Sequence, residues 1–200
     1  MQLYRGTTPT GFVMIAAAHA RGAGAQPMPA AAERAWLPRL GALTIRPLLL
    51  GDIGAYRAFG AKLAREDLRL RFAGLVKLDD PALCARLLDI DHDRVEVLAA
   101  FDAAGAMLGV ARLSRVALAA AEAALIVRSD LKRRGLRRLL LERLARYAAD
   151  RGIDTLSAQV LHENYPMLRL AMTAGFHPVA TSGFLIELRG ALPQGCDFDL

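Results

Sequence analysis

One stretch near the middle of the chain restricts the possible folds more than any other. Residues 119–127 are almost entirely apolar and are typical of a buried strand. They lead into a basic loop, and a long helix is predicted from about Gly135 to Arg151. Apolar side chains recur at helical spacing along it, at Leu136, Leu140, Leu144 and Tyr147. A buried strand, a loop and an amphipathic helix in this order indicate a mixed α/β domain.

The flanking patterns extend this prediction to a whole sheet. Further strands are expected at residues 43–45, 95–101, 107–113, 156–161 and 184–188. Further helices are expected at about 52–65, from about 81, and at 165–174, the last capped by Asn164 and ended by Gly175. In chain order, the expected elements are helices, then antiparallel strands, then alternating strand and helix. This order predicts a mixed sheet in a domain that covers residues 41–200.

Residues 1–40 have a different character. They are rich in Ala, Gly and Pro and carry no sustained helical or alternating pattern. The apolar run 12–20 follows Arg5 and only weakly resembles a secretory signal. We expect an N-terminal leader over 1–40, either flexible or packed on the domain as an extra element.

Composition narrows the classes of partner. Lys and Arg number 26 against 20 for Asp and Glu, so the net charge is +6, which suits nucleic acid, a membrane surface or a phosphorylated cofactor. Genome base composition could account equally well for this total, so local clusters are more informative. The longest apolar runs fall short of the ~20 residues of a membrane span. Cys84 and Cys196 cannot build a disulfide framework, and no metal-ligand spacing occurs. We expect a cytoplasmic protein that binds neither membrane nor metal.

The basic loop is the first candidate site. It carries five cations around Gly135, namely Lys132, Arg133, Arg134, Arg137 and Arg138. Free backbone N–H groups at a helix N-terminus bind phosphate, and the helix dipole adds to that attraction. The residues alone leave two interpretations open: a cradle for a pyrophosphate, or a solvated basic turn before an ordinary helix.

Two linked motifs resemble those of the GCN5-related N-acetyltransferases, the GNAT family. In the family's pattern Gln/Arg-x-x-Gly-x-Gly/Ala, Lys132 falls at the first position, Gly135 at the first Gly and Arg137 at the second small residue. The segment from Asn164 to Gly175-Phe176 is similar to the family's motif after the fifth strand. The resemblance implies a central, mostly antiparallel mixed sheet flanked by helices, with a V-shaped split between two parallel strands.

The resemblance also implies a site for acetyl-CoA between the strands at 119–127 and 156–161. The backbone of Leu125, Ile126 and Val127 would hold the pantetheine arm. The pyrophosphate would lie on the loop, with Asn164 nearby, and the loop residues are Lys132, Arg133, Arg134, Gly135, Leu136, Arg137 and Arg138.

Three short segments narrow the resemblance to the acetyltransferase domain of bacterial protein lysine acetyltransferases, which act on acyl-CoA synthetases and related proteins. The segments are 66–72, 91–94 (where His92 departs from the more usual Tyr) and 121–124. The acceptor implied is a protein lysine, with a small amine as the alternative. Leu68, Leu70 and Phe72 would form a hydrophobic anchor in a loop, although core packing is the favoured interpretation.

Glu122 is the candidate catalytic residue. It is a lone carboxylate in an apolar strand, where an unpaired charge is costly. An outward-facing position would make it a solvated surface residue. If it faces the cleft, its desolvated carboxylate can take a proton from a lysine amine, whose ordinary pKa is near 10.4. The lysine acetyltransferases that the chain resembles use a Glu at this position in that role.

Two departures from the family pattern favour a second hypothesis, a catalytically degenerate module that binds acyl-CoA or another protein. Ala171 stands where many members have a Tyr that protonates the leaving thiolate, and Arg137 stands where a small residue lets backbone approach the pyrophosphate. We expect Arg137 to weaken or shift acetyl-CoA binding. Nucleic-acid binding is disfavoured, because no aromatic residues interleave the basic cluster.

Overall fold

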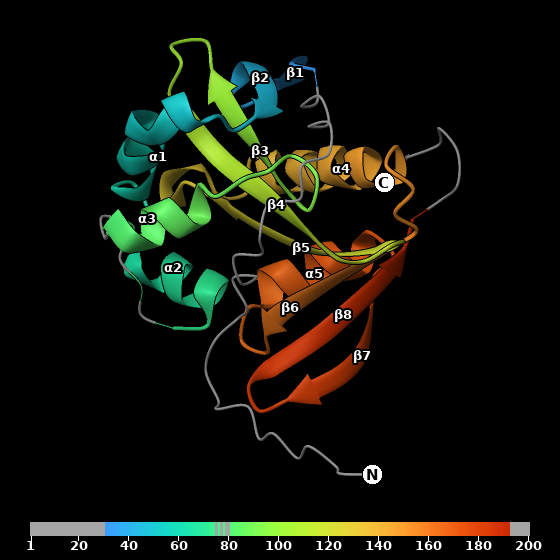
Figure 1. The fold of residues 1–200 in the computed structure, drawn as a ribbon. Helices are drawn as coiled ribbons and strands as arrows, with labels where there is room; N and C mark the ends of the chain where they lie inside the picture. The colour runs from blue at the N-terminus through green and yellow to red at the C-terminus, as the bar shows by residue number, and fades with distance from the viewer. Residues whose placement is uncertain (1–30, 75, 77, 79–80, 193–200) are drawn as a thin grey trace.

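The computed structural model describes residues 31–74, 76, 78 and 81–192. A single eight-stranded sheet runs through this part of the chain in the order β1-β2-β3-β4-β5-β6-β8-β7 (Figure 1). The strands are β1 Glu33–Leu37, β2 Gly41–Pro47, β3 Val95–Asp102, β4 Met107–Ala117, β5 Ala120–Val127, β6 Thr155–Leu161, β7 His177–Ser182 and β8 Leu185–Ala191. Neighbouring strands are antiparallel except β5 and β6, which are parallel.

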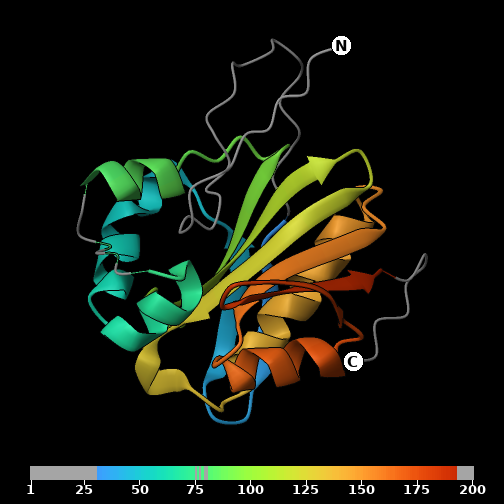
Figure 2. The same ribbon diagram turned by 90° about the horizontal axis from the view of Figure 1, so that it is seen from below.

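Helices cover both faces of the sheet (Figures 1 and 2). The short helices α1 Ile53–Gly60, α2 Arg65–Phe72 and α3 Pro81–Leu87 gather on one side, and the longer α4 Leu136–Ala149 and α5 Tyr165–Thr173 pack on the other. Alternation along β3 supplies both cores: Leu98 and Ala100 join the α4 side, whereas Val97 and Phe101 join the α1 side. Two further turns of 3₁₀ helix are η1 Leu50–Asp52 and η2 Ser129–Leu131.

The parallel pair opens into a V. β5 and β6 pair only over Ala120–Glu122 and Thr155–Ser157. β5 then stays on β4 as far as Val127, and β6 stays on β8 as far as Leu161. Beyond Glu122 the facing edges of the two strands therefore present backbone N–H and C=O groups to the gap between them. The mixed, mostly antiparallel sheet with a V-shaped split is thus confirmed.

The helix predicted from Gly135 begins at Leu136 and ends at Ala149, and its apolar face is buried as expected. The helix predicted from about residue 81 is α3, and Asn164 caps α5 as predicted, because its Oδ1 accepts from the N–H of Met167 at 3.4 Å. None of the helices in the described part of the chain has the length and apolar character needed to cross a bilayer.

Two local expectations were wrong: the helix predicted over 52–65 ends at Gly60, and strand β7 was not predicted. Leu68, Leu70 and Phe72 belong to helix α2 and not to a loop. The favoured core packing holds for Leu68, which is buried, and for Phe72, which packs against the same core. The acidic first turn and basic last turn of α2 suit the helix dipole, but its apolar residues are too few to reveal a helical period. Strand β7 was missed because all its side chains are exposed, so no buried alternation marks it.

The chain also enters the sheet earlier than expected. Strand β1 lies within residues 1–40 and pairs with β2 from Glu33↔Ile45 to Leu37↔Gly41. Residues 1–30 lie outside the described residues, so the proposed leader and the boundary at 41 stay predictions.

Candidate functional site

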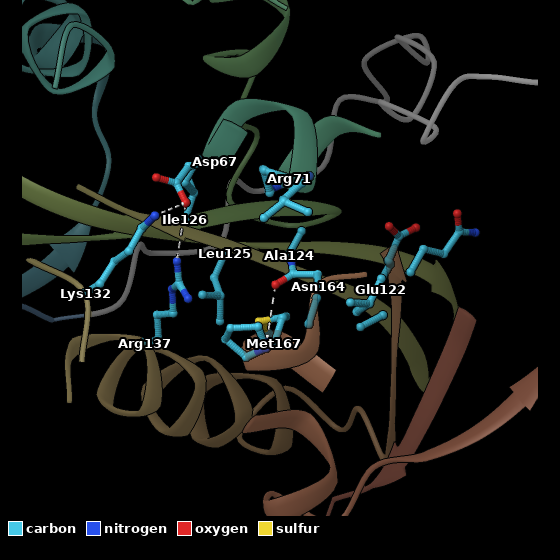
Figure 3. A pocket seen from close by; sticks show the side chains of 16 residues that line it. Asp67, Arg71, Glu122, Ala124, Leu125, Ile126, Lys132, Arg137, Asn164 and Met167 are labelled. Atoms are coloured by element: carbon cyan, nitrogen blue, oxygen red, sulfur yellow. Dashed lines mark hydrogen bonds and ion pairs between the residues drawn. The ribbon is translucent and has the colours of Figure 1, made fainter. Parts of the chain in front are cut away.

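A pocket of about 120 Å³ lies at the V. Five parts of the chain line it: Asp67, Leu70 and Arg71 of α2; residues 122–126 of β5; Lys132 and Arg137 of the basic loop and α4; residues 158–160 of β6; and Asn164, Pro166 and Met167 at the start of α5 (Figure 3). The structure thus brings together six of the site residues that the sequence analysis predicted: Glu122, Leu125, Ile126, Lys132, Arg137 and Asn164. It also adds Asp67 and Arg71 of α2, whereas of this helix the sequence had suggested only Leu68, Leu70 and Phe72, as a hydrophobic anchor.

The basic loop has the backbone shape of an anion site. Arg133 has φ 59° and Gly135 has φ 85°, so the chain twice enters the left-handed region just before α4. Alternating turns of this kind direct successive N–H groups to one side and form an anion-binding concavity. Gly135 is the N-cap of α4, and no side chain in the described residues caps the helix there. The first N–H groups of α4 and its dipole are therefore available to an anion.

The side chains of the loop point in different directions. Lys132 and Arg137 line the pocket. Arg134 donates to the backbone oxygen of Arg39 at 3.3 Å, and Arg138 pairs with Glu142 at 2.7 Å, so neither reaches the pocket. Arg133 and the buried Leu136 do not line it either. The side chains of these four residues therefore lie outside the pocket lining.

Asp67 is the main residue that sequence reasoning missed. Its carboxylate is buried and receives a hydrogen bond from the Ser129 hydroxyl at 2.5 Å. Lys132 Nζ lies 2.8 Å from Asp67 Oδ1, and Arg137 Nη2 lies 3.9 Å from the same oxygen. Both pocket-lining cations of the loop are therefore turned toward α2 (Figure 3). No local pattern could reveal this, because 62 residues separate Asp67 from Ser129.

A second ionic contact holds α2 on the other side of the V. Arg69 Nη1 lies 2.6 Å from Glu163, which precedes α5, and its Nη2 lies 2.7 Å from Glu66 on its own helix. Asp67 and Arg69 thus tie α2 to the segments that follow β5 and β6, respectively. The helix spans the mouth of the V from one strand to the other.

Glu122 lies at the apex of the V. It forms the last parallel pair with Ser157 of β6, and on its other side it pairs with Ser114 of β4. Its side chain lines the pocket, and burial raises the pKa of this carboxyl, while the nearby charges of Arg71 and Arg112 oppose that rise. Of the two positions considered for Glu122, the structure shows the one that faces the cleft. The carboxylate is a partly desolvated group of the pocket wall and not a solvated edge residue.

Other sequence candidates lie outside the pocket lining. Val127 is fully buried in the core beside α4. Ala171, at the position of the family Tyr, is 1% exposed and packs in the same core. His162 stacks on Phe184 with ring centroids 5.8 Å apart. In the part of the chain that the structure describes, no group of His, Cys, Asp and Glu side chains could hold a metal ion.

Three solved structures share this fold. The GNAT domain of S. lividans PAT is 24% identical with a TM-score of 0.76, covering 80% of this chain and 97% of that one. Spermidine N-acetyltransferase from Vibrio cholerae, in complex with CoA and spermine, is 17% identical with a TM-score of 0.62, covering 75% and 95%. A cAMP-binding acyltransferase from Mycobacterium smegmatis is 24% identical with a TM-score of 0.57, covering 81% of this chain and 47% of that one.

The split sheet and the shared architecture thus define an acyltransferase fold. The family model described as the acetyltransferase (GNAT) family matches residues 63–176, more than half of the chain. The chain therefore belongs to the GNAT family and is an N-acetyltransferase, a class that uses acetyl-CoA and an amine acceptor.

Proposed function

We propose that this enzyme transfers the acetyl group of acetyl-CoA to a lysine side chain of a protein. The observation that carries the proposal is the V itself: β5 and β6 separate at Glu122, and the gap leads from that carboxylate to the N-terminus of α4. One pocket thereby joins a partly desolvated base to an anion-binding helix end, as transfer from a thioester of a phosphorylated carrier requires.

The proposed donor position follows from the free backbone groups. The pantetheine arm would lie along the unpaired edge of β5 at Leu125–Val127 and bond to it as an added strand does. The pyrophosphate would lie at residues 132–138, on N–H groups at the start of α4, with Asn164 nearby. Arg137 extends its guanidinium toward Asp67 and into the pocket, although its Cβ remains close to the path of the phosphates.

The proposed chemistry is a direct attack. Glu122 accepts a proton from the lysine ammonium, directly or through water, and the resulting amine attacks the thioester carbon. The raised pKa of Glu122 suits a base that must work near neutral pH. Coenzyme A leaves as the thiolate. Because Ala171 carries no hydroxyl, water protonates the sulfur.

The choice of a protein lysine over a small amine rests on two supports: the segments 66–72, 91–94 and 121–124, and the likeness to the S. lividans PAT domain. The likeness to the spermidine enzyme keeps a polyamine as the competing acceptor. A module that binds acyl-CoA without transferring it is the second candidate function, and Arg137 and Ala171 are the observations that favour it.

The test is a transfer assay on the full chain with radiolabelled acetyl-CoA. A purified acyl-CoA synthetase and spermidine are compared as acceptors, and binding of acetyl-CoA is measured in parallel by calorimetry. We expect label on the protein acceptor, and a fall in rate of about a hundredfold or more in Glu122→Gln with binding retained. Glu187→Gln is the matched control. The charge of Glu187 contributes to the raised pKa of Glu122, but Glu187 does not line the pocket.

Three other results of these assays would contradict part of the proposal. Label on spermidine alone would identify a polyamine enzyme. Binding without transfer to either acceptor would favour the non-catalytic module. Unchanged turnover in Glu122→Gln would eliminate Glu122 as the base.

A further inference from the structure

Arg71 differs from the other cationic side chains at the mouth of the V. Lys132 and Arg137 approach Asp67, and Arg69 is paired with Glu66 and Glu163. Arg71 lines the same pocket, yet no described residue forms a hydrogen bond or an ion pair with its guanidinium. Its Cζ lies over the ring of Phe72, 4.8 Å from the ring centroid.

The guanidinium of Arg71 is nevertheless a charged group in a desolvated place. Burial lowers the pKa of Arg71 to about 10, with Tyr56 and Glu122 opposing the decrease, so the side chain carries its charge at neutral pH. The side chain is only partly exposed, so its charge is incompletely solvated, and a polar group of a ligand in the pocket could accept its hydrogen bonds.

The groups around Arg71 do not supply such an acceptor. On its own helix, Asp67 is occupied by Ser129 and Lys132. From the sheet, Arg112 carries the same charge and donates to the backbone oxygen of Leu87 at 2.9 Å. Glu122 and Tyr56 are close enough to raise the pKa of Arg71 but accept no hydrogen bond from it. The free N–H groups of Arg71 therefore remain available to the pocket.

The position of Arg71 along the pocket indicates what it meets. In the view of Figure 3, Arg71 enters from α2 between Asp67 on the side of the basic loop and Glu122 on the other side. A thioester whose phosphates lie on the loop and whose carbon is attacked beside Glu122 has its carbonyl at the Glu122 end of the pocket. Arg71 lines the same pocket and is close enough to Glu122 for their charges to interact.

We propose that Arg71 is a further catalytic residue, which donates a hydrogen bond to the carbonyl oxygen of the thioester. The proposal rests on acetyl transfer at this pocket. The lysine nitrogen bonds to the carbonyl carbon, and the C=O electron pair moves onto oxygen, where Arg71 stabilises the negative charge. Glu122 has already taken one proton from the lysine ammonium, and the nitrogen gives its second proton to water after the attack. The C=O bond then re-forms, and the C–S bond breaks with its electron pair on the coenzyme thiolate. Charge stabilisation at this atom is often the largest single contribution to acyl-transfer catalysis.

The first test is kinetic and uses Arg71→Gln, Arg71→Lys and the control Arg65→Gln. Arg65 is an exposed residue of the same helix, so its loss changes the charge of α2 equally. We expect kcat to fall by about 10²–10³-fold in Arg71→Gln, as when one oxyanion donor is removed, with the KM for acetyl-CoA little changed. Arg71→Lys, which keeps the charge, loses less.

The second test isolates the carbonyl contact in the ground state. Binding of S-(2-oxopropyl)-CoA, which has a carbonyl near the position of the thioester, is compared with that of S-propyl-CoA, which has none. The parent protein should prefer the ketone by about tenfold or more, as expected for a hydrogen bond from a charged donor. Arg71→Gln should bind both analogues equally, whereas Arg65→Gln should keep the preference.

Two results would overturn the proposal. One is an Arg71→Gln variant that keeps its kcat or its preference for the ketone. The other is an effect confined to the KM of acceptors that carry a carboxylate, which would make Arg71 an acceptor-binding residue. If the parent protein transfers no acetyl group, the proposed function fails, but the analogue pair still tests the contact of Arg71 with the carbonyl.

Discussion

Glu122 lies under two opposing demands at the scale of a single residue. The proposed role as general base favours a carboxylate held in a desolvated wall, because its raised pKa makes it a better base. Stability favours a neutral group there, because burial penalises the charge. The second demand can be measured without any substrate.

We expect Glu122→Gln to have a larger free energy of unfolding than the parent at pH 7. The pKa of Glu122 is raised in the folded protein, so the folded state binds more protons than the unfolded state between the two pKa values. The parent therefore loses stability as pH rises from the unfolded pKa, about 4.3, through the folded value. The measurement is urea unfolding of both proteins at pH 7 and pH 3.5. The advantage of the Gln variant should be present at pH 7 and vanish at pH 3.5, and an equal difference at both values would contradict the explanation.

Arg137 gives a second prediction at this scale. Its Cβ stands where the family pattern needs a small residue for close approach of the backbone to a pyrophosphate, and its half-buried guanidinium is turned toward Asp67. We expect Arg137→Gly to bind acetyl-CoA more tightly, although Gly in the first turn of α4 costs up to ~1 kcal/mol of stability. Calorimetric titration at two salt concentrations is the measurement. Tighter and more salt-dependent binding by the parent would make Arg137 a phosphate clamp instead.

At the scale of an element, α2 depends on tertiary contacts more than on its own sequence. It has eight residues, too few for an isolated helix to be stable in water. Asp67 joins it to Ser129 and Lys132, and the Ser129 hydroxyl in turn accepts from the N–H of Ala64 at 2.7 Å. The segment after β5 thus fixes both the start of α2 and its first turn.

We expect Asp67→Ala to cost about 1–3 kcal/mol of stability, because a buried carboxylate that accepts charged and neutral hydrogen bonds is lost. Amide hydrogen exchange should accelerate chiefly in α2 and in residues 129–132. Glu66→Ala, at the exposed neighbouring position, should stay within about 0.5 kcal/mol of the parent. Exchange that is unchanged in α2 would mean that apolar packing alone, through Leu68, holds the helix.

At the scale of the whole molecule, the pocket proposed for the donor is assembled from both helical layers and the sheet between them. α2 belongs to the layer with α1 and α3, whereas α4 and α5 belong to the other. A ligand that spans the V contacts all of these parts, so its binding should stabilise the domain as a unit.

Acetyl-CoA at a hundredfold excess over its dissociation constant should stabilise the folded protein by about 2.7 kcal/mol. The measurement is thermal unfolding with and without the ligand, and acetate at equal concentration is the control. Protection in hydrogen exchange should appear in α2 as well as in β5 and α4. Protection of α4 alone would mean that only the phosphate end of the ligand is held.

The sequence by itself determined most of the elements and indicated six of the residues that line the pocket. The apolar run into β5, the amphipathic period of α4 and the cap at Asn164 act over a few residues, so local patterns reveal them. Glu122 stood out for the same reason, as one charge in an apolar strand. Family motifs added the split sheet, which no local pattern specifies.

Only the tertiary structure decided which groups face one another. The V begins at Glu122 because pairing with β6 stops at Ser157, and where it stops depends on how β4 and β8 hold the two strands. Asp67 meets Lys132, and Arg71 enters the pocket, because α2 packs across the gap between the segments that follow β5 and β6. Charge pairing over such sequence separations is set by packing in three dimensions, and no periodicity along the chain encodes it.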